Sequence, residues 1–399
     1  MVNDVSLENF KGIEKLEIAD LSRINVFVGR NETGKSTILE ALSLCLSVND
    51  DYHDYLNRDI LTDYILSKYS TFTNLIRIGS DHSTVAIDGN TNVFEIIHER
   101  SGISGNGHLN EKIVRGIDTL GREYSIRQMS SKLPLHGEKE SDIFKSEAME
   151  EFKQQFIEKL LNDESIIIKG FHKGKLVNSK VSYSEPLRNY FQYQKKISDY
   201  YRSENHNFGS PVSLFGKTGT SGRGNVIFYS SERNIKFKEL HDIAINQKSI
   251  GKILNKIKKK IDYFQDLRQT NGNFRLLSKE SKMAIPFEVR GDGLKSFIYM
   301  MFMEKILERG TILIEEPENF LHPGLMGSWC NDVISKDSKN QYFISTHSCE
   351  LLEYMLENDD LRKDLKVFKM FKDPFDYEAI PGDEAYERVI ELKEDLRGI

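Results

Sequence analysis

The sequence predicts an α/β protein whose core is a mainly parallel β-sheet. A glycine-containing loop at residues 29–36 separates the apolar segment Ile24–Val28 from a helical pattern that follows it. Two further continuous apolar segments, Thr311–Ile314 and Gln341–Ser345, occur late in the chain, after more helical patterns. Strands that are buried on both faces form such runs, and their alternation with helices is typical of parallel sheets.

The N-terminal elements surround this loop. Short strands are expected at Val5–Leu7 and Leu16–Ile18, and a helix at Thr37–Leu46. Farther along, alternating apolar residues predict three more strands, at 75–78, 83–87 and 93–98, with Asp88–Asn90 as the turn between the last two.

The rest of the chain is divided by helical spacing and by turn residues. These patterns predict helices at 146–161, 186–201, 250–267, 294–309 and 384–399, a strand at 225–229 and a hairpin at 274–289. The stretch 208–225 is rich in glycine and serine and is expected to be a flexible loop.

Composition narrows the class of protein. The chain has 399 residues, a formal net charge of -6 and 39% hydrophobic residues, as expected for one large globular domain or two smaller ones. Its three cysteines are far apart and suggest neither a disulfide framework nor zinc spacing. The N-terminus lacks a signal-peptide pattern and no apolar run is long enough to span a bilayer, so we expect a cytoplasmic protein without a membrane partner.

Gly29–Ser36 fits the phosphate-binding pattern G-x-x-x-x-G-K-S/T at every fixed position. Its glycines let backbone N–H groups curl around phosphate oxygens, and the following helix adds positive partial charge from its N-terminus. Lys35 would contact the β- and γ-phosphates of a nucleotide, and the Ser36 hydroxyl would bind Mg²⁺. The residues expected to contact the nucleotide here are Gly29, Arg30, Asn31, Glu32, Thr33, Gly34, Lys35, Ser36 and Thr37.

Two carboxylates end the predicted strand at 311–314. In a chain that also has a phosphate-binding loop, Glu315 would reach the Mg²⁺ shell and Glu316 would orient the attacking water as general base. His347 follows the next predicted strand, where it can hydrogen-bond the γ-phosphate or the water. Each feature alone also fits an ordinary strand end, but their order along the chain favours Lys35, Glu316 and His347 as catalytic residues.

Together these motifs resemble the ABC-type P-loop ATPases of the SMC, RecF and OLD (overcoming lysogenization defect) group. In that group an Asn-Phe turn, here Asn9–Lys11, precedes the phosphate-binding loop, and a signature loop, here Arg290–Ser296, precedes the carboxylates. The Gly-Asp-Gly-Leu form is most similar to OLD-like and standalone AAA-domain ATPases. The resemblance implies that Gly291, Asp292 and Gly293 bind ATP held by the opposite subunit of a homodimer, with ATP and Mg²⁺ at each interface site.

The resemblance covers residues 1–50 and 225–399, which we expect to form an ABC-type ATPase head, with residues 51–224 as an inserted region of mixed strands and helices. The chain departs from the group at Glu315, where Asp is usual, and at Gly291, where serine is usual. The glutamine loop is not assigned, and Gln128 is one candidate among several. Because the stretch after His347 is short, we do not expect the Toprim nuclease domain that OLD nucleases carry.

The sequence leaves the partner open. The basic stretch 216–224, the lysines within 252–260 and the aromatic residues within 190–201 could contact DNA or RNA, although a solvated or packing role is the commoner meaning of each. We expect an ATP-hydrolysing dimeric switch that acts with nucleic acid or a separate effector protein, in phage defence or DNA maintenance. The alternative is an effector whose inserted region processes DNA or RNA directly.

Overall fold

The computed structural model describes residues 1–69, 72–99, 165–183, 224–230, 235–270, 273–280, 283–319, 321, 323–332, 334, 338–372 and 374–398. They fall into two units, each described by itself: one comprises Met1–Glu95, Lys169–Asn178 and Thr218–Ile399, the other Ile96–Ile168 and Ser179–Lys217. The first unit contains all the predicted site residues. Gln128 and the helices predicted at 146–161 and 186–201 lie outside the described residues, as does the predicted loop 208–225 except for its last two residues.

A six-stranded sheet forms the core of the first unit. Its order is β15-β14-β3-β13-β12-β8, and all neighbours are parallel except β14 and β15. Every residue of β3, β12 and β13 is buried, which explains their apolar runs and confirms the predicted mainly parallel α/β core. The strands are β3 (Ile24–Val28), β8 (Val226–Tyr229), β12 (Thr311–Glu315), β13 (Gln341–Ser345), β14 (Leu365–Phe371) and β15 (Asp376–Pro381).

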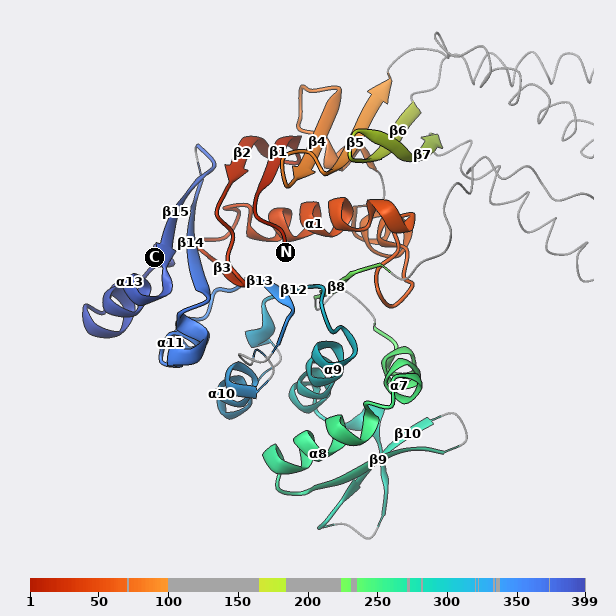
Figure 1. Cartoon of the computed structure of the whole chain (residues 1–399), viewed down its shortest axis with the longest axis vertical. Helices are drawn as coiled ribbons and strands as arrows, with labels where there is room; N and C mark the ends of the chain where they lie inside the picture. Colours follow the sequence, from red (N-terminus) through yellow and green to blue (C-terminus); the bar gives the residue numbers. More distant parts are fainter. Residues whose placement is uncertain are drawn as a thin grey trace, which may run out of the picture. The chain divides into compact units, whose positions relative to one another are not determined.

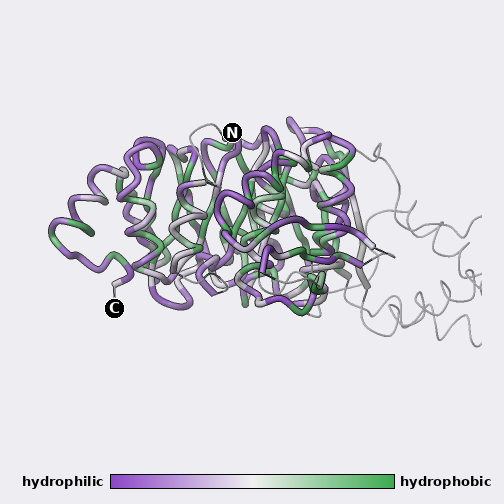
Figure 2. Tube along the Cα trace, turned by 90° about the horizontal axis from the view of Figure 1, so that it is seen from below, coloured by the Kyte–Doolittle hydropathy of each residue, from purple (hydrophilic) through white to green (hydrophobic). Residues whose placement is uncertain are grey.

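Helices cover both faces of this sheet (Figure 1). One face carries α1 (Lys35–Leu46), and the other carries α9 (Asp292–Ile306), α10 (Pro323–Asp332) and α11 (Cys349–Leu356). In the tube coloured by hydropathy, apolar residues gather in the inner segments, whereas the outer loops are mostly hydrophilic (Figure 2).

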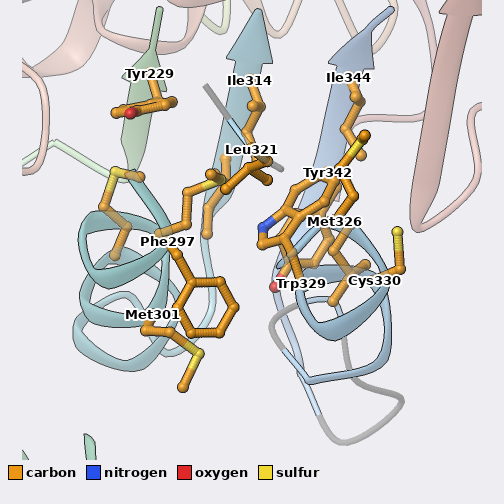
Figure 3. Close-up of a cluster of buried hydrophobic side chains, with 14 of the residues drawn as sticks. Tyr229, Phe297, Met301, Ile314, Leu321, Met326, Trp329, Cys330, Tyr342 and Ile344 are labelled. Carbon is orange, nitrogen blue, oxygen red and sulfur yellow. The ribbon is translucent and has the colours of Figure 1, made fainter. Parts of the chain in front are cut away.

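Side chains of the strands alternate between these two faces. Ile314 and Ile344 join Phe297 of α9 and Trp329 of α10 in one buried cluster (Figure 3). Phe27 faces the other way and stacks on two further aromatic rings, with centroids 6.4 Å and 5.2 Å away, those of Phe343 and Phe368.

A second sheet, antiparallel where β1 pairs with β2 and β4, covers the other side of α1. The thiol of Cys45 in α1 donates to the carbonyls of Val85 (3.6 Å) and Asn92 (3.1 Å). The order of this sheet is β2-β1-β4-β5-β6-β7. Its strands are β1 (Val5–Phe10), β2 (Ile13–Ile18), β4 (His82–Ile87), β5 (Asn92–Glu99), β6 (Ser165–His172) and β7 (Lys175–Tyr183).

The predicted helix 250–267 is wrong in its second half. Helix α8 (Ile250–Lys260) follows α7 (Phe237–Asn246) and stops before a small antiparallel sheet of β9 (Phe264–Thr270), β10 (Asn273–Ser278) and β11 (Ile285–Pro286). Phe264 and Leu267 are both buried and lie three residues apart, a spacing that imitates a helix, but they belong to β9, which pairs with β10.

Two other predictions are wrong. The segment predicted as a strand at 75–78 begins in the last residue of a 3-10 helix, Phe72–Leu75; within this segment only Ile76 forms a bridge, an isolated one, and Ile78 is 98% exposed. The closing helix predicted at 384–399 is replaced by α13 (Gly382–Tyr386) and one π-helical stretch, Glu387–Glu391, after which the chain is irregular. None of the helices in the described ranges is both long and apolar enough to cross a membrane.

Candidate active site

The phosphate-binding loop connects the end of β3 to the start of α1. Gly29 and Gly34 have φ angles of 148° and 90°, and Glu32 has a φ of 64°. A Cβ atom on Gly29 would lie 2.8 Å from the carbonyl oxygen of Met370 and 3.0 Å from Thr33 Oγ1. Both the backbone angle and the space therefore require glycine at position 29. The loop leads directly into the first turn of α1, whose N–H groups have no partners within the helix and suit an anion.

Lys35 is held inside this loop. Its ammonium donates to the carbonyl oxygens of Gly29 (2.9 Å) and Arg30 (2.7 Å), and only 4% of the residue is exposed. Burial lowers the pKa of Lys35 to about 8, and the carboxylates of Glu316 and Glu318 oppose that shift. Phosphate oxygens in place of the two carbonyls would favour the charged form, so the site is matched to an anionic ligand.

Arg30, Glu32 and Thr33 of the phosphate-binding loop form polar contacts within the loop and with segments near the C-terminus. Thr33 Oγ1 donates to the carbonyl of Arg30 (2.9 Å), whose guanidinium donates in turn to the carbonyl of Gly398. The Glu32 carboxylate forms an ion pair with Lys372 at 2.6 Å. The other predicted ligands differ in burial: Asn31 is exposed, and Ser36 and Thr37 are half-buried in the first turn of α1.

The two predicted carboxylates stand at the end of β12. Glu315 is 9% exposed, and strand alternation places it on the sheet face that α1 covers. Glu316 donates its N–H to the carbonyl of Ser345 at 2.9 Å and has a φ of 45°. A left-handed angle at a non-glycine residue costs about 1–3 kcal/mol, and residues held in such conformations cluster at active sites as well as in turns.

Glu316 meets His347 at this edge of the sheet. His347 Nε2 lies 3.2 Å from Glu316 Oε1, and Asn319 Nδ2 donates to the other carboxylate oxygen at 2.7 Å. Burial lowers the pKa of His347, the charge of Lys35 acts in the same direction, and Glu316 opposes both. The imidazole is therefore neutral near pH 7 and donates from one ring nitrogen. The structure thus brings together Lys35, Glu316 and His347, the three residues predicted to be catalytic.

Three residues that the sequence analysis did not assign to the site contact this pair: Glu318 and Arg397 contact His347, and Asn319 contacts Glu316. Glu318 Oε1 accepts hydrogen bonds from Thr346 Oγ1 (2.8 Å) and from the N–H of His347 (2.6 Å), and burial raises the pKa of Glu318. Arg397 Nη1 donates to the carbonyl of His347 at 3.2 Å. The position of Glu318 and Asn319 directly after the carboxylates was a usable signal, whereas no local pattern indicated Arg397.

Ser36 and Glu315 are the residues predicted to hold Mg²⁺. A hydroxyl and a carboxylate are oxygen ligands of the kind that Mg²⁺ prefers. Ser345 is aligned with Glu315 on the neighbouring strand, and its buried Oγ has no hydrogen-bond partner among the described residues, which fits a hydrated cation nearby. In the described part of the chain, no group of three or more His, Cys, Asp and Glu side chains could hold a metal. Phosphate and water would therefore have to complete the shell.

The signature loop is not joined to these residues. Gly291 and Asp292 are exposed at the start of α9, where Asp292 pairs with Lys295 at 2.7 Å. Nothing lies within 4 Å of the position that a Cβ on Gly291 would take. Within the described ranges, no hydrogen bond or ion pair connects residues 290–293 to the phosphate-binding loop. The loop therefore presents an open surface.

Several known proteins are similar to this chain. The sequence matches the AAA ATPase domain family over residues 1–352. It is 24% identical to an ATP/GTP phosphatase of Helicobacter pylori over 100% of both chains. It is also 30% identical to an uncharacterised protein of Methanocaldococcus jannaschii, over 27% of this chain and 99% of that protein.

Solved structures of SMC heads also match. One, bound to the C-winged helix domain of ScpA, is 14% identical, covers 98% of this chain and 99% of its own, and has a TM-score of 0.45. Another, derived from Pyrococcus furiosus and bound to the C-terminal domain of ScpA, is 11% identical with the same coverage and a TM-score of 0.43.

The family match spans most of the chain and includes the phosphate-binding loop, both carboxylates and His347. The expected assignment to the P-loop ATPases is thereby confirmed. The chain belongs to the AAA ATPase domain family and is an ATPase.

Proposed function

We propose that the protein is an ATP-driven switch of the OLD/SMC-like type, in which two copies close on two molecules of ATP with Mg²⁺. The observation that carries this proposal is the Glu316–His347 pair, 3.2 Å apart and close enough to Lys35 for their charges to interact. A carboxylate, a neutral imidazole and a buried ammonium at one strand edge suit phosphoryl transfer, which needs positioning and charge neutralisation more than covalent chemistry.

Each residue has a role in this proposal. The backbone of Gly29–Thr37 and the Lys35 ammonium hold the phosphates. Glu316 orients the attacking water and accepts its proton, and His347, beside Glu316, hydrogen-bonds the γ-phosphate or the water. Ser36 and Glu315 would hold Mg²⁺, which when bound neutralises charge on the β- and γ-phosphates.

Exposure of the signature loop supports a site shared between two copies. A Cβ atom on Gly291 would meet open space, and Val289, the residue before the loop, is 70% exposed. The first N–H groups of α9, a helix of 15 residues, suit a phosphate. In a closed dimer, Gly291, Asp292 and Gly293 of one copy would bind the γ-phosphate held by the other.

Closure of the two copies would be transmitted to a partner by another part of the chain. We propose residues 1–50 and 225–399 as the head and residues 51–224 as the inserted region that transmits closure to DNA, RNA or a separate effector protein. A cytoplasmic location and a role in phage defence or DNA maintenance belong to the same proposal. The alternative, direct processing of nucleic acid by the inserted region, concerns residues that mostly lie outside the described ranges.

Replacing Lys35 tests the nucleotide site itself. Lys35→Ala removes the buried ammonium, and we expect loss of ATP binding in calorimetric titration and loss of phosphate release. Circular dichroism should show an unchanged fold. ATP affinity and turnover equal to those of the wild type would refute the site.

A further inference from the structure

The main chain of His347 is held from both sides by residues outside the nucleotide loops. We propose that Glu318 and Arg397 are positioning residues for His347, because they fix its peptide groups so that the imidazole stays against Glu316. The proposal rests on the proposed catalytic role of His347 and adds two residues to it.

Glu318 holds the N–H side of this peptide. Its Oε1 accepts from the His347 N–H at 2.6 Å and from Thr346 Oγ1 at 2.8 Å, and Thr346 Oγ1 itself accepts from the N–H of Ser348 at 2.9 Å. Glu318 Oε2 is buried and has no partner among the described residues, so both hydrogen bonds of this carboxylate are made to the histidine segment. Bonds of this charge-assisted kind are among the strongest in proteins.

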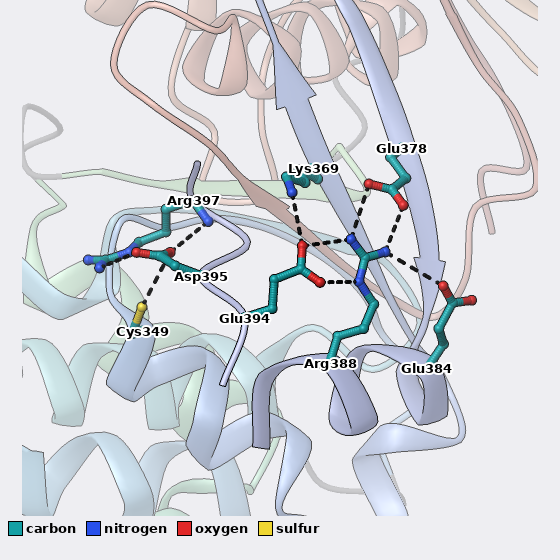
Figure 4. Close-up of polar contacts among 8 residues, drawn as sticks. All are labelled: Cys349, Lys369, Glu378, Glu384, Arg388, Glu394, Asp395 and Arg397. Atoms are coloured by element: carbon teal, nitrogen blue, oxygen red, sulfur yellow. Dashed lines mark hydrogen bonds and ion pairs between the residues drawn. The ribbon is translucent and has the colours of Figure 1, made fainter. Parts of the chain in front are cut away.

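Arg397 holds the carbonyl side. Its guanidinium donates to both carboxylate oxygens of Asp395, from Nε to Oδ1 at 3.0 Å and from Nη2 to Oδ2 at 2.8 Å (Figure 4). This fork fixes the plane of the guanidinium and leaves Nη1 for the carbonyl of His347 at 3.2 Å. The pairing with Asp395 therefore directs Arg397 Nη1 at the carbonyl of His347.

The C-terminal segment 395–398, which contains Arg397, is also hydrogen-bonded to the phosphate-binding loop. The carbonyl of Gly398 accepts a hydrogen bond from Arg30 Nε. Residues 395–398 thus join the loop that would hold phosphate to the loop that carries His347. They lie beyond residue 352, where the family match ends, so the general ATPase pattern does not account for them.

Among the described residues, neither Glu318 nor Arg397 forms a hydrogen bond or ion pair with a residue of the phosphate-binding loop, although the charge of Glu318 acts on Lys35. Their loss should therefore misplace the imidazole while leaving the phosphate contacts intact. For Arg397→Ala and Glu318→Ala in the full chain we expect kcat to fall about 10–100-fold, the usual effect of losing a residue that orients a site ligand, with KM for ATP within about twofold. Glu318→Gln keeps an acceptor oxygen and should recover part of the rate.

Arg388→Ala is the matched control. Arg388 lies nearby in the sequence and forms more ion pairs than Arg397, with Glu378, Glu384 and Glu394 (Figure 4). Within the described part of the chain, its hydrogen bonds and ion pairs do not include His347. We expect Arg388→Ala to lower the melting temperature at least as much as Arg397→Ala and to keep a near wild-type kcat. If kcat fell equally in the two variants, the effect would be one of stability and the proposal would be overturned.

Combination with His347→Ala separates positioning from every other role. If Arg397 acts through the histidine, Arg397→Ala should lower kcat no further in the His347→Ala background. Additive losses in the double variant, or a wild-type kcat for Arg397→Ala alone, would overturn the proposal. A wild-type kcat for His347→Ala would remove the proposed role of the histidine and the positioning with it, whereas a slow His347→Ala beside a normal Arg397→Ala would refute the positioning alone.

Discussion

At the scale of single residues, the site is defined by ionisable groups that burial shifts toward their neutral forms. Burial lowers the pKa of Lys35 to about 8 and lowers the pKa of His347, and it raises the pKa of Glu318. Such shifts, centred on one strand edge, are typical of sites that bind charged ligands. For Lys35 the shift also predicts how ATP binding depends on pH.

Lys35 predicts how ATP affinity depends on pH. Its lowered pKa means that the ammonium is charged below about pH 8 and neutral above it in the free protein. ATP favours the charged form, so affinity should be constant below about pH 8 and fall by up to about tenfold per pH unit above it, as proton uptake becomes linked to binding. Titration calorimetry would measure this. Lys35→Arg, if it binds, should show no such fall, and a flat profile for the wild type would contradict the assignment.

Substitutions of the two adjacent carboxylates, Glu315 and Glu316, should have different effects on nucleotide binding and turnover. We expect Glu316→Gln to bind MgATP normally but to turn over about 10²–10⁴-fold more slowly, the usual loss for a general base. The amide oxygen can still accept from Asn319, so local structure should be retained. Glu315→Gln should weaken Mg²⁺-dependent nucleotide binding as well. The opposite pattern in titration calorimetry and phosphate-release assays would mean that the two roles are reversed.

At the scale of elements, the sequence predicted those helices and strands whose pattern is complete within one short stretch of the chain. The strand, loop and helix around Gly29–Ser36 form one contiguous unit, and every residue of β12 and β13 is buried, as their apolar runs predicted. In contrast, β14 and β15 were not predicted at all, because β14 is fixed by pairing with β3, far away in the sequence. The irregular C-terminal segment is held by ion pairs of Arg388 and by the contacts of Arg397, which no periodicity reveals.

The candidate site divides in the same way. The three residues predicted to be catalytic follow from motifs, whereas the hydrogen bonds around His347 are visible only in the folded chain. Glu318 could be suspected from its position, but its partner Thr346 lies 28 residues away in the sequence. Arg397 lies 50 residues from His347, so only the tertiary structure reveals that contact.

Substitution by alanine should destabilise the protein much more at Gly29 than at Gly291. Gly29→Ala places a Cβ 2.8 Å from a backbone oxygen at a φ of 148°, and we expect a loss of about 1–3 kcal/mol in the free energy of unfolding together with weakened ATP binding. Gly291→Ala has a φ of -58° and open space, so its cost should stay below about 1 kcal/mol. Urea denaturation would measure both, and equal losses would contradict the loop geometry.

At the scale of the whole molecule, the proposed switch needs two copies. In this proposal one copy would supply the phosphate-binding loop and the carboxylates, and the other would supply the exposed loop at the start of α9. Because ATP would contact both, its binding energy would favour the closed state over the open one. The family match shows an ATPase, while closure in pairs remains our proposal.

Mixing two inactive variants tests action between subunits. Lys35→Ala lacks a working phosphate-binding loop, and Gly293→Arg blocks the start of α9. In a mixed dimer, one of the two composite sites would combine an intact loop from each copy. We therefore expect partial recovery of ATP hydrolysis on mixing, up to about half the wild-type rate per mixed dimer if the sites act independently. No recovery, in mixtures shown to contain mixed dimers, would argue against sites formed between subunits.

The most direct test of the switch is sedimentation velocity of the Glu316→Gln variant with and without MgATP. This variant should bind ATP and hydrolyse it slowly, which would preserve the closed state for measurement. We predict a monomer without nucleotide and a dimer with MgATP, and no dimer with MgATP when Gly293→Arg is added. A monomer under both conditions, together with wild-type turnover per chain that does not depend on protein concentration, would contradict the account.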